Sequence, residues 1–145
     1  MIAVDTNVLV HAHRRDSTWH ARAAAVMREL AEGRSAWAVP WPCVHEFFAI
    51  VTHRKIYAPP SSIPEAVEQL EAWFAAPGIH LLAEGDEHWA TLRRALVNNR
   101  LRGPQVHDAR IAAICVQHGV DELWTADRDF SRFADLRTRN PLAGG

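Results

Sequence analysis

Apolar positions along this chain alternate between short continuous runs and longer amphipathic stretches, and each pattern predicts one type of element. Short runs typical of strands occur at residues 1–5, 36–40, 79–82, 122–125 and 136–139. Stretches with helical spacing cover residues 17–33, the segment after Pro42, the segment from Pro64 to Pro77, and residues 85–100 and 107–118. Strands separated by helices indicate βαβ units. We therefore expect an α/β fold with three layers, α/β/α, and a central, mostly parallel sheet of four to five strands.

Glycine and proline mark the boundaries of these elements. Gly33 and Gly119 follow two of the expected helices, whereas Pro42 and Pro64 suit the first turn of a helix. Residues 55–62 are rich in proline and serine, which predicts a loop.

Length and composition favour one ordinary globular domain, residues 1–145. The chain is 48% hydrophobic and 23% charged, with a net charge of -1, which is atypical of disordered or membrane proteins. Charge at Asp5 and Arg14 interrupts the N-terminus, so we expect no signal peptide and a cytoplasmic location. Cys43 and Cys115 lie among apolar residues, and we expect buried free thiols.

Four acidic residues occupy places where a strand ends or a helix begins: Asp5, Glu46, Asp108 and Asp127. In a parallel sheet, ligands collect beyond the carboxyl ends of the strands, where the strand order reverses. Asp5 and Asp127 each follow an expected strand, so their side chains should share one site. Clustered carboxylates repel one another, and a hard divalent cation, Mg²⁺ or alternatively Mn²⁺, relieves that repulsion.

Each acid also has a purely structural explanation. Asp5 could cap a helix, Asp127 could cap the turn that contains Asp129, and Asp108 could stabilise a helix N-terminus. Glu46 lies opposite the apolar stripe of its helix and could face water. Capping does not explain Glu46, and the recurrence at equivalent places favours a common site.

Four segments carry a resemblance to a known family: Val4–Leu9, the helix with Glu46 after Pro42, His107–Ala113 and Thr125–Phe130. In this order they resemble the motifs of the PIN-domain nucleases, and the whole chain is similar to the VapC-like toxins of bacterial toxin–antitoxin pairs. The resemblance implies a PIN-like fold and a set of metal-binding acids, namely Asp5, Glu46, Asp108 and Asp127, with Asp129 as an occasional fifth. It also implies supporting polar groups, namely Thr6, Asn7 and Thr125. Which of Asp127 and Asp129 faces the metal stays open.

The implied function is that of a Mg²⁺-dependent endoribonuclease, the toxin of a pair with a VapB-like antitoxin. Carboxylate-held Mg²⁺ can activate water and neutralise charge on phosphate, so no protein nucleophile is needed. The preference for RNA over DNA rests on the resemblance alone. A PIN-like domain that binds RNA or protein without cutting is the main alternative. A phosphatase of the haloacid dehalogenase type is disfavoured because Asn7 stands where its second Asp would be.

Arginine outnumbers lysine by 15 to one and is concentrated in two groups. One group precedes the third acid and includes Arg94, Arg100 and Arg102; the other, at the C-terminus, includes Arg128 and Arg132. Guanidinium groups bind phosphate in a bidentate manner. We expect Arg100, Arg102 and Arg128 to contact RNA, with solvated helix surfaces as the alternative. His107 is expected at the surface or behind a metal ligand, and zinc is not expected because no Cys/His set has ligand spacing.

Aromatic residues are numerous, and four of them cluster around the second strand and its helix: Trp37, Trp41, Phe47 and Phe48. If these residues are exposed, we expect a homodimer in which they are buried. The resemblance also implies a homodimer. An aromatic-rich core is the alternative.

Overall fold

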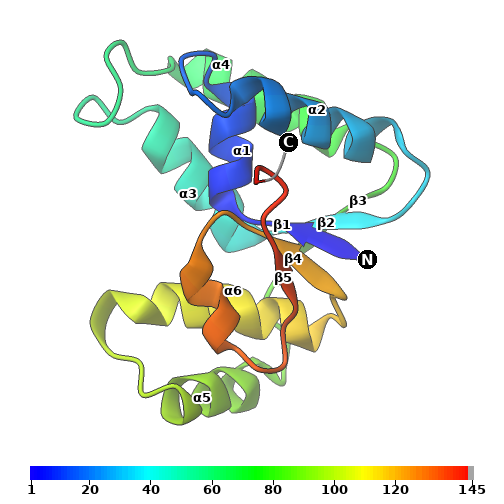
Figure 1. Ribbon diagram of the computed structural model, residues 1–145, viewed down its shortest axis with the longest axis vertical. Helices are drawn as coiled ribbons and strands as arrows, with labels where there is room; N and C mark the ends of the chain where they lie inside the picture. Colours follow the sequence, from blue (N-terminus) through cyan, green and yellow to red (C-terminus); the bar gives the residue numbers. More distant parts are fainter. Residues whose placement is uncertain (144–145) are drawn as a thin grey trace.

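A computed structural model of the protein describes residues 1–143 and contains one sheet of five parallel strands (Figure 1). The strands are β1 (Ile2–Val4), β2 (Trp37–Pro40), β3 (Ile79–Leu82), β4 (Glu122–Trp124) and β5 (Thr138–Arg139). Their order across the sheet is β3-β2-β1-β4-β5. The predicted parallel α/β sheet is confirmed, and 136–139 does contain its fifth strand.

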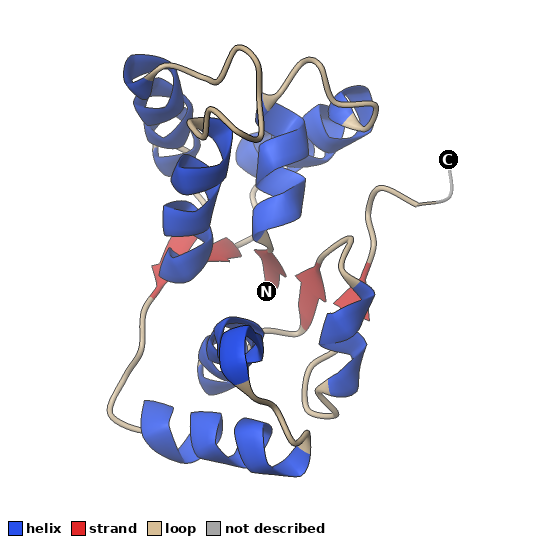
Figure 2. Cartoon of the chain, turned by 90° about the vertical axis from the view of Figure 1, so that its left-hand side faces the viewer, coloured by secondary structure: helices blue, strands red, loops and turns tan. Residues whose placement is uncertain are grey.

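Helices cover both faces of this sheet, as Figures 1 and 2 show. One layer contains α1 (Thr6–His13), α2 (His20–Glu32), α3 (Trp41–Val51) and α4 (Ile63–Phe74). The other contains α5 (His88–Asn98) and α6 (Val106–Gln117), with the 3₁₀ turns η1 (Gly103–Gln105) and η2 (Arg128–Arg132) on the same side. The three-layer α/β/α prediction is confirmed.

The strand order reverses between β1 and β4. From β1 the chain builds β2 and β3 on one side of the sheet and then β4 and β5 on the other. The backbone N–H of Asp5 donates to the carbonyl of Trp124 over 3.0 Å, so the two strand ends stay paired to the last residue. Residues that follow β1 and β4 are thereby placed side by side.

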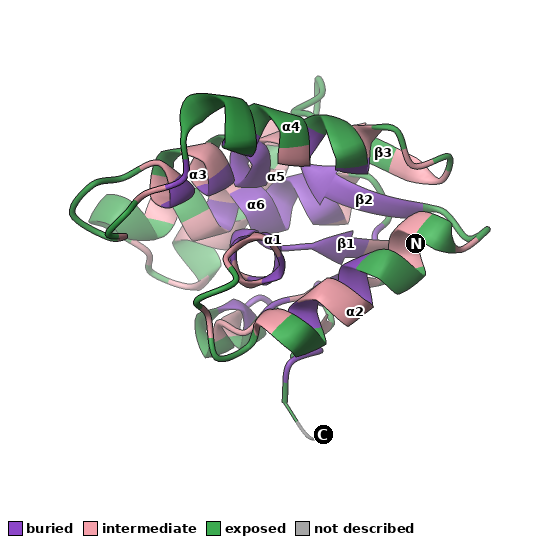
Figure 3. Ribbon diagram, turned by 90° about the horizontal axis from the view of Figure 1, so that it is seen from above, coloured by how far each residue is buried: buried purple, intermediate pink, exposed green. Residues whose placement is uncertain are grey.

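The apolar core lies around β1, β2, α1 and α6 (Figure 3). Ala3 and Val4 of β1 are fully buried, and α6 buries Ile111 and Ile114 against the sheet. In contrast, α5 buries no residue completely and packs mainly on α6. Both cysteines are buried free thiols, as expected.

Signals at the helix ends behave as the sequence predicts. Ser62 and Glu65 form a reciprocal capping box at the start of α4, and Gly33 is the C-terminal cap of α2. Gly119 has a φ of 67° directly after α6, a conformation that glycine adopts without strain. Within residues 1–143, every helix falls short of the length and apolar character needed to cross a membrane.

Helix α1 was not predicted from the sequence, which suggested a helix only from residue 17 onward. The chain enters α1 immediately after β1 because Asp5 caps it: the Asp5 carboxylate accepts the N–H of Thr6 over 2.8 Å. Val8, Leu9 and Ala12 form its buried side, a helical spacing that could have revealed it. The next helix, α2, starts at His20, later than expected.

The predicted aromatic surface around β2 is wrong for two of its four residues. Trp37 and Phe47 are both 0% exposed, and Phe47 packs edge-on against Trp73. Trp41 and Phe48 are half-buried against the same core. The large apolar side chains that face solvent lie elsewhere: Trp19, Ile56, Ile63, Val67, Trp89 and Val97.

Candidate functional site: an acidic cluster at the strand-order reversal

Asp5 is the innermost acid of the site and is only 4% exposed. Its Oδ2 accepts hydrogen bonds from the Thr125 hydroxyl over 2.7 Å and from the Asn7 amide over 3.0 Å. Its Oδ1 accepts the Thr6 N–H and contacts the Cys43 thiol at 3.6 Å. A buried carboxylate needs such donors because it has given up its hydration.

Thr125 and Asn7 connect the end of β1 to the end of β4. The Asn7 amide donates to the Thr125 hydroxyl over 3.1 Å and accepts the backbone N–H of Ala126 over 2.9 Å. Thr125 Oγ1 also accepts the N–H of Asp127 over 3.0 Å. The three supporting polar groups expected from the sequence, Thr6, Asn7 and Thr125, therefore all lie at the acids.

Glu46 joins the cluster from α3. Its Oε2 accepts the Thr6 hydroxyl over 2.8 Å, so the first residue of α1 orients it. The side chain is half-buried, and its charge is felt by both Asp5 and Asp108. The water-facing alternative for Glu46 is thereby excluded.

Asp108, Asp127 and Asp129 form the open part of the site. One carboxylate oxygen of each lies within 4.8 Å of the others. Asp108 belongs to the first turn of α6, while Asp127 caps η2 and accepts the N–H of Asp129 over 2.9 Å. Asp127 and Asp129 each contribute a carboxylate oxygen to this group. Asp5 and Glu46 lie behind this triad and are not part of the same close group.

Electrostatic strain in the cluster is visible in two pKa values. Burial raises the pKa of Asp5 to about 6, and the charge of Glu46 adds to the effect, while the hydrogen bonds from Thr125 and Thr6 oppose it. Burial and the neighbouring Asp127, Glu46 and Asp129 raise the pKa of Asp108. Each shift disfavours the charged form, so the cluster stores repulsion that a cation would relieve.

The triad fits a hard divalent cation. In an octahedral site with ligands at about 2.1 Å, adjacent oxygens lie about 3.0 Å apart and opposite oxygens about 4.2 Å, and the three carboxylate oxygens here lie within 4.8 Å of one another. The donors are all carboxylate oxygens, which suit Mg²⁺, Mn²⁺ or Ca²⁺ better than a soft, thiolate-binding ion. The three side chains are therefore grouped so that they could hold one divalent metal once their oxygens draw closer together.

Two neighbours of the acids were not anticipated. The Cys43 thiol contacts Asp5 from α3, one helical turn before Glu46; that spacing was a usable signal. Arg132 donates from Nε to the Asp129 carbonyl over 2.9 Å, and its guanidinium lies 3.6 Å from the Asp129 carboxylate. Arg132 lowers the pKa of Asp108, partly offsetting the crowding of negative charge.

The arginines proposed for RNA lie at the surface. Arg128 follows Asp127 directly, while Arg100 and Arg102 occupy the connection between α5 and η1. All three are exposed. His107 is also exposed, and with Glu46 it borders a hollow between α3 and α6.

A family model for the PIN domain matches residues 2–136. The chain belongs to the PIN-domain family. Ribonuclease VapC43 of Mycobacterium tuberculosis is 35% identical to this PIN domain over 144 residues, which cover 99% of this chain and 97% of that protein. Ribonuclease VapC48 of the same species is 31% identical over 140 residues, 97% of each chain. This PIN domain is thus a member of the VapC ribonuclease group.

Solved structures agree with the fold. VapC20 of Mycobacterium tuberculosis, a toxin that cleaves the sarcin-ricin loop, superimposes with a TM-score of 0.68 at 16% identity and covers 92% of this PIN domain and 95% of its own chain. VapBC2 from Rickettsia felis, solved with a DNA fragment from its promoter, gives a TM-score of 0.67 at 17% identity over 97% of this chain and 98% of that one. At these identities, the likeness concerns the fold alone.

We predict that the metal-free protein loses stability as the pH rises through about 6. The folded protein binds the Asp5 proton more tightly than the unfolded chain, whose ordinary pKa is 3.8. The resulting stabilisation is fully present below about pH 4 and is lost above about pH 6, on the order of 3 kcal/mol for a buried group. Urea unfolding in EDTA between these pH values should show this slope.

The matched variants are Asp5→Asn, which removes the titrating group, and Asp86→Asn, which changes an exposed carboxylate far along the chain. Asp5→Asn should flatten the pH dependence, whereas Asp86→Asn should retain it. An identical slope in wild type and Asp5→Asn would show that Asp5 does not titrate in this range.

Proposed function

We propose that this protein, as a single PIN domain of residues 1–145, is a Mg²⁺-dependent endoribonuclease and the toxin of a toxin–antitoxin pair. The observation that carries the proposal is the acidic triad at the strand-order reversal, backed by Asp5 and Glu46. The VapC ribonucleases at 31–35% identity support RNA as the substrate. A cytoplasmic location follows for a protein whose substrate is a cellular RNA.

The acids divide the work in this proposal. Asp108, Asp127 and Asp129 would hold the metal, Mg²⁺ or alternatively Mn²⁺, as oxygen ligands. When bound, this ion supplies neutralisation of charge at the scissile phosphate and acidifies an attacking water. Asp5 sets the position of Asp127 through Thr125 Oγ1, to which both residues are hydrogen-bonded. Glu46 is held by Thr6 at Oε2, so its carboxylate is oriented to accept a proton from water at the same site.

A PIN domain that binds RNA without cutting it is the alternative. Such a domain has no need for a carboxylate whose pKa is raised by burial and by neighbouring carboxylates, as that of Asp108 is. Incubation of RNA with and without Mg²⁺ separates the two functions, because only the nuclease yields cleaved, metal-dependent products.

We predict that Asp108→Ala abolishes Mg²⁺-dependent RNA cleavage, by about a hundredfold or more, because a lost ligand removes several kcal/mol of metal assistance. The metal-free variant should fold and be as stable as wild type or slightly more so, since a repelled charge is gone. Asp86→Ala is the control of equal charge change. Full activity of Asp108→Ala would refute the metal site.

The exposed arginines near the site are proposed to bind the phosphates of RNA. Replacing Arg100 and Arg102 together by Ala should weaken RNA binding. It should also make the slope of log K for RNA binding against log salt concentration shallower, because fewer contacts with phosphate release fewer counterions on binding. Mg²⁺ or Mn²⁺ binding by the triad should be unchanged. An unaltered salt slope would show that both side chains are only solvated.

A homodimer is also proposed, now on a different surface from the one the sequence suggested. Trp89 and Val97 of α5 are 65% and 61% exposed, and large exposed apolar side chains are typical of contact surfaces. Sedimentation at micromolar concentration should show a dimer that Trp89→Glu weakens. Trp19→Glu, which changes an equally large exposed side chain near α2, should leave it intact. Wild-type protein that sediments only as monomer would exclude the dimer.

We further propose that a VapB-like antitoxin inhibits by placing an Arg or Lys side chain among the acids. Five carboxylates without metal create a negative potential that a cation can neutralise. Binding of Mn²⁺, followed by electron paramagnetic resonance, should then fall when the antitoxin is added. Unchanged Mn²⁺ binding in the inhibited complex would instead indicate steric inhibition at another face.

A further inference from the structure

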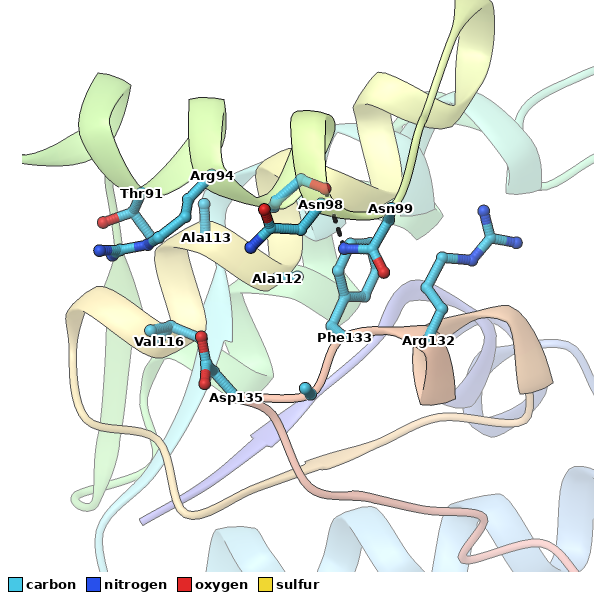
Figure 4. Close-up of a pocket in the computed structure, with 12 residues that line it drawn as sticks. Thr91, Arg94, Asn98, Asn99, Ala112, Ala113, Val116, Arg132, Phe133 and Asp135 are labelled. Carbon is cyan, nitrogen blue, oxygen red and sulfur yellow. Dashed lines mark hydrogen bonds between the residues drawn. The ribbon is translucent and has the colours of Figure 1, made fainter.

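A pocket of about 220 Å³ lies between α5, α6 and the segment that follows η2 (Figure 4). Its apolar surface consists of Ala112, Ala113 and Val116 on α6 together with Phe133. Its polar side chains come from α5, from Arg132 at the end of η2 and from Asp135 in the segment that follows. The pocket is separate from the acidic triad, because none of the three acids lines it.

Two asparagines of α5 present amide groups to this pocket. The Asn98 amide points into it in Figure 4, and this side chain has no hydrogen-bond partner within residues 1–143. The neighbouring Asn99 donates from Nδ2 to the Ala95 carbonyl over 2.9 Å, which fixes the amide and leaves its oxygen as an acceptor. The pair therefore offers donors and acceptors next to an apolar wall.

Each of the two arginine groups of the sequence contributes one side chain to this pocket. Arg94 comes from the group before the third acid and Arg132 from the C-terminal group, and both side chains line the pocket. Arg94 forms no ion pair with any residue of the described chain, so its guanidinium is available to an anion. Arg132 already pairs with Asp129 and so connects the pocket to the triad.

The distance to the acids suits a continuous ligand. Ala112 follows Asp108 by four residues on α6, a rise of about 6 Å along the helix axis. A chain with one phosphate at the triad could therefore place its next unit at the pocket without leaving the protein surface.

We propose that this pocket is a subsite for one unpaired nucleotide of the RNA, next to the phosphate that is cut. Proteins read single-stranded RNA by burying a splayed base against apolar or aromatic groups and hydrogen-bonding its edges. The wall of Ala113, Val116 and Phe133 receives the base, Asn98 faces its polar edge, and Arg94 binds phosphate. The inference rests on the proposed ribonuclease function and gives it a source of sequence preference.

The first test uses the full chain in EDTA, where no cleavage can occur, with the four ribonucleoside 5′-monophosphates as probes. Saturable amide shifts in NMR spectra are expected at Asn98, Asn99 and Ala113. Asn98→Ala and Arg94→Ala should each weaken this binding by at least about threefold. Arg93→Ala is the matched control, since it removes the same charge one residue earlier on α5 but does not line the pocket. If the pocket instead accommodates a protein side chain, the monophosphates should not bind, and this outcome would contradict the proposal.

The second test maps cleavage of an RNA library in Mg²⁺. Asn98→Ala should alter the base preference at one position beside the cut, whereas Arg93→Ala should reproduce the wild-type pattern. Shifts absent at about 10 mM nucleotide, where a site with a Kd of about 1 mM is nearly filled, or an unchanged pattern in Asn98→Ala, would overturn the subsite. If the protein cleaves RNA but fails these tests, the subsite is wrong and the ribonuclease function stands. If it binds nucleotide here but does not cleave RNA, the ribonuclease function is wrong and only the binding pocket stands.

Discussion

The hydrogen bonds that join Asp5 to Thr125 across the β1–β4 junction are the interaction on which the rest of the site depends. A carboxylate that is 4% exposed loses its hydration, and the donors of Thr6, Asn7 and Thr125 replace that water. The same Asp5 oxygen that accepts the Thr6 N–H also begins α1, so helix, sheet and site share one residue. Through Thr125 Oγ1 the arrangement continues to Asp127 and hence to the triad.

The site is built with an unfavourable electrostatic arrangement that the surrounding fold tolerates. Five carboxylates lie near one another, and the pKa values of Asp5 and Asp108 are raised, first by burial and further by the neighbouring negative charges. Arg132 pairs with Asp129 at one edge and relieves only part of this repulsion. Such stored repulsion is typical of functional sites, where stability is given up for affinity toward a ligand of opposite charge. The apolar core around β1, β2 and α6 supplies the compensating stability.

The distribution of arginine explains how a protein with a net charge of -1 can still engage a polyanion. Positive side chains flank parts of the site: Arg128 follows Asp127 in the chain, Arg132 pairs with Asp129, and Arg94 lines the pocket beside α6. In the proposed function, attraction of a polyanion is therefore local and does not depend on the net charge. The large exposed apolar residues, such as Trp89 on α5, do not line the pocket.

The sequence by itself determined the periodicity of apolar residues in each segment, the glycine and proline residues at element boundaries and the acids that follow strands. All three are local properties of the chain. The parallel sheet and its fifth strand followed from the periodicity and the buried cysteines from their apolar neighbours, whereas the family followed from the resemblance of four segments to the motifs of PIN-domain nucleases. Only the tertiary structure decided which side chains meet: it buried Trp37 and Phe47, grouped Asp127 and Asp129 with Asp108, and placed Arg94 and Arg132 around one pocket. Exposure and distance between elements depend on how layers pack across the sheet, which no single segment encodes. Helix α1 is an intermediate case. Asp5 could be identified in the sequence as a possible helix cap, but the helix itself was not predicted because it has only 8 residues.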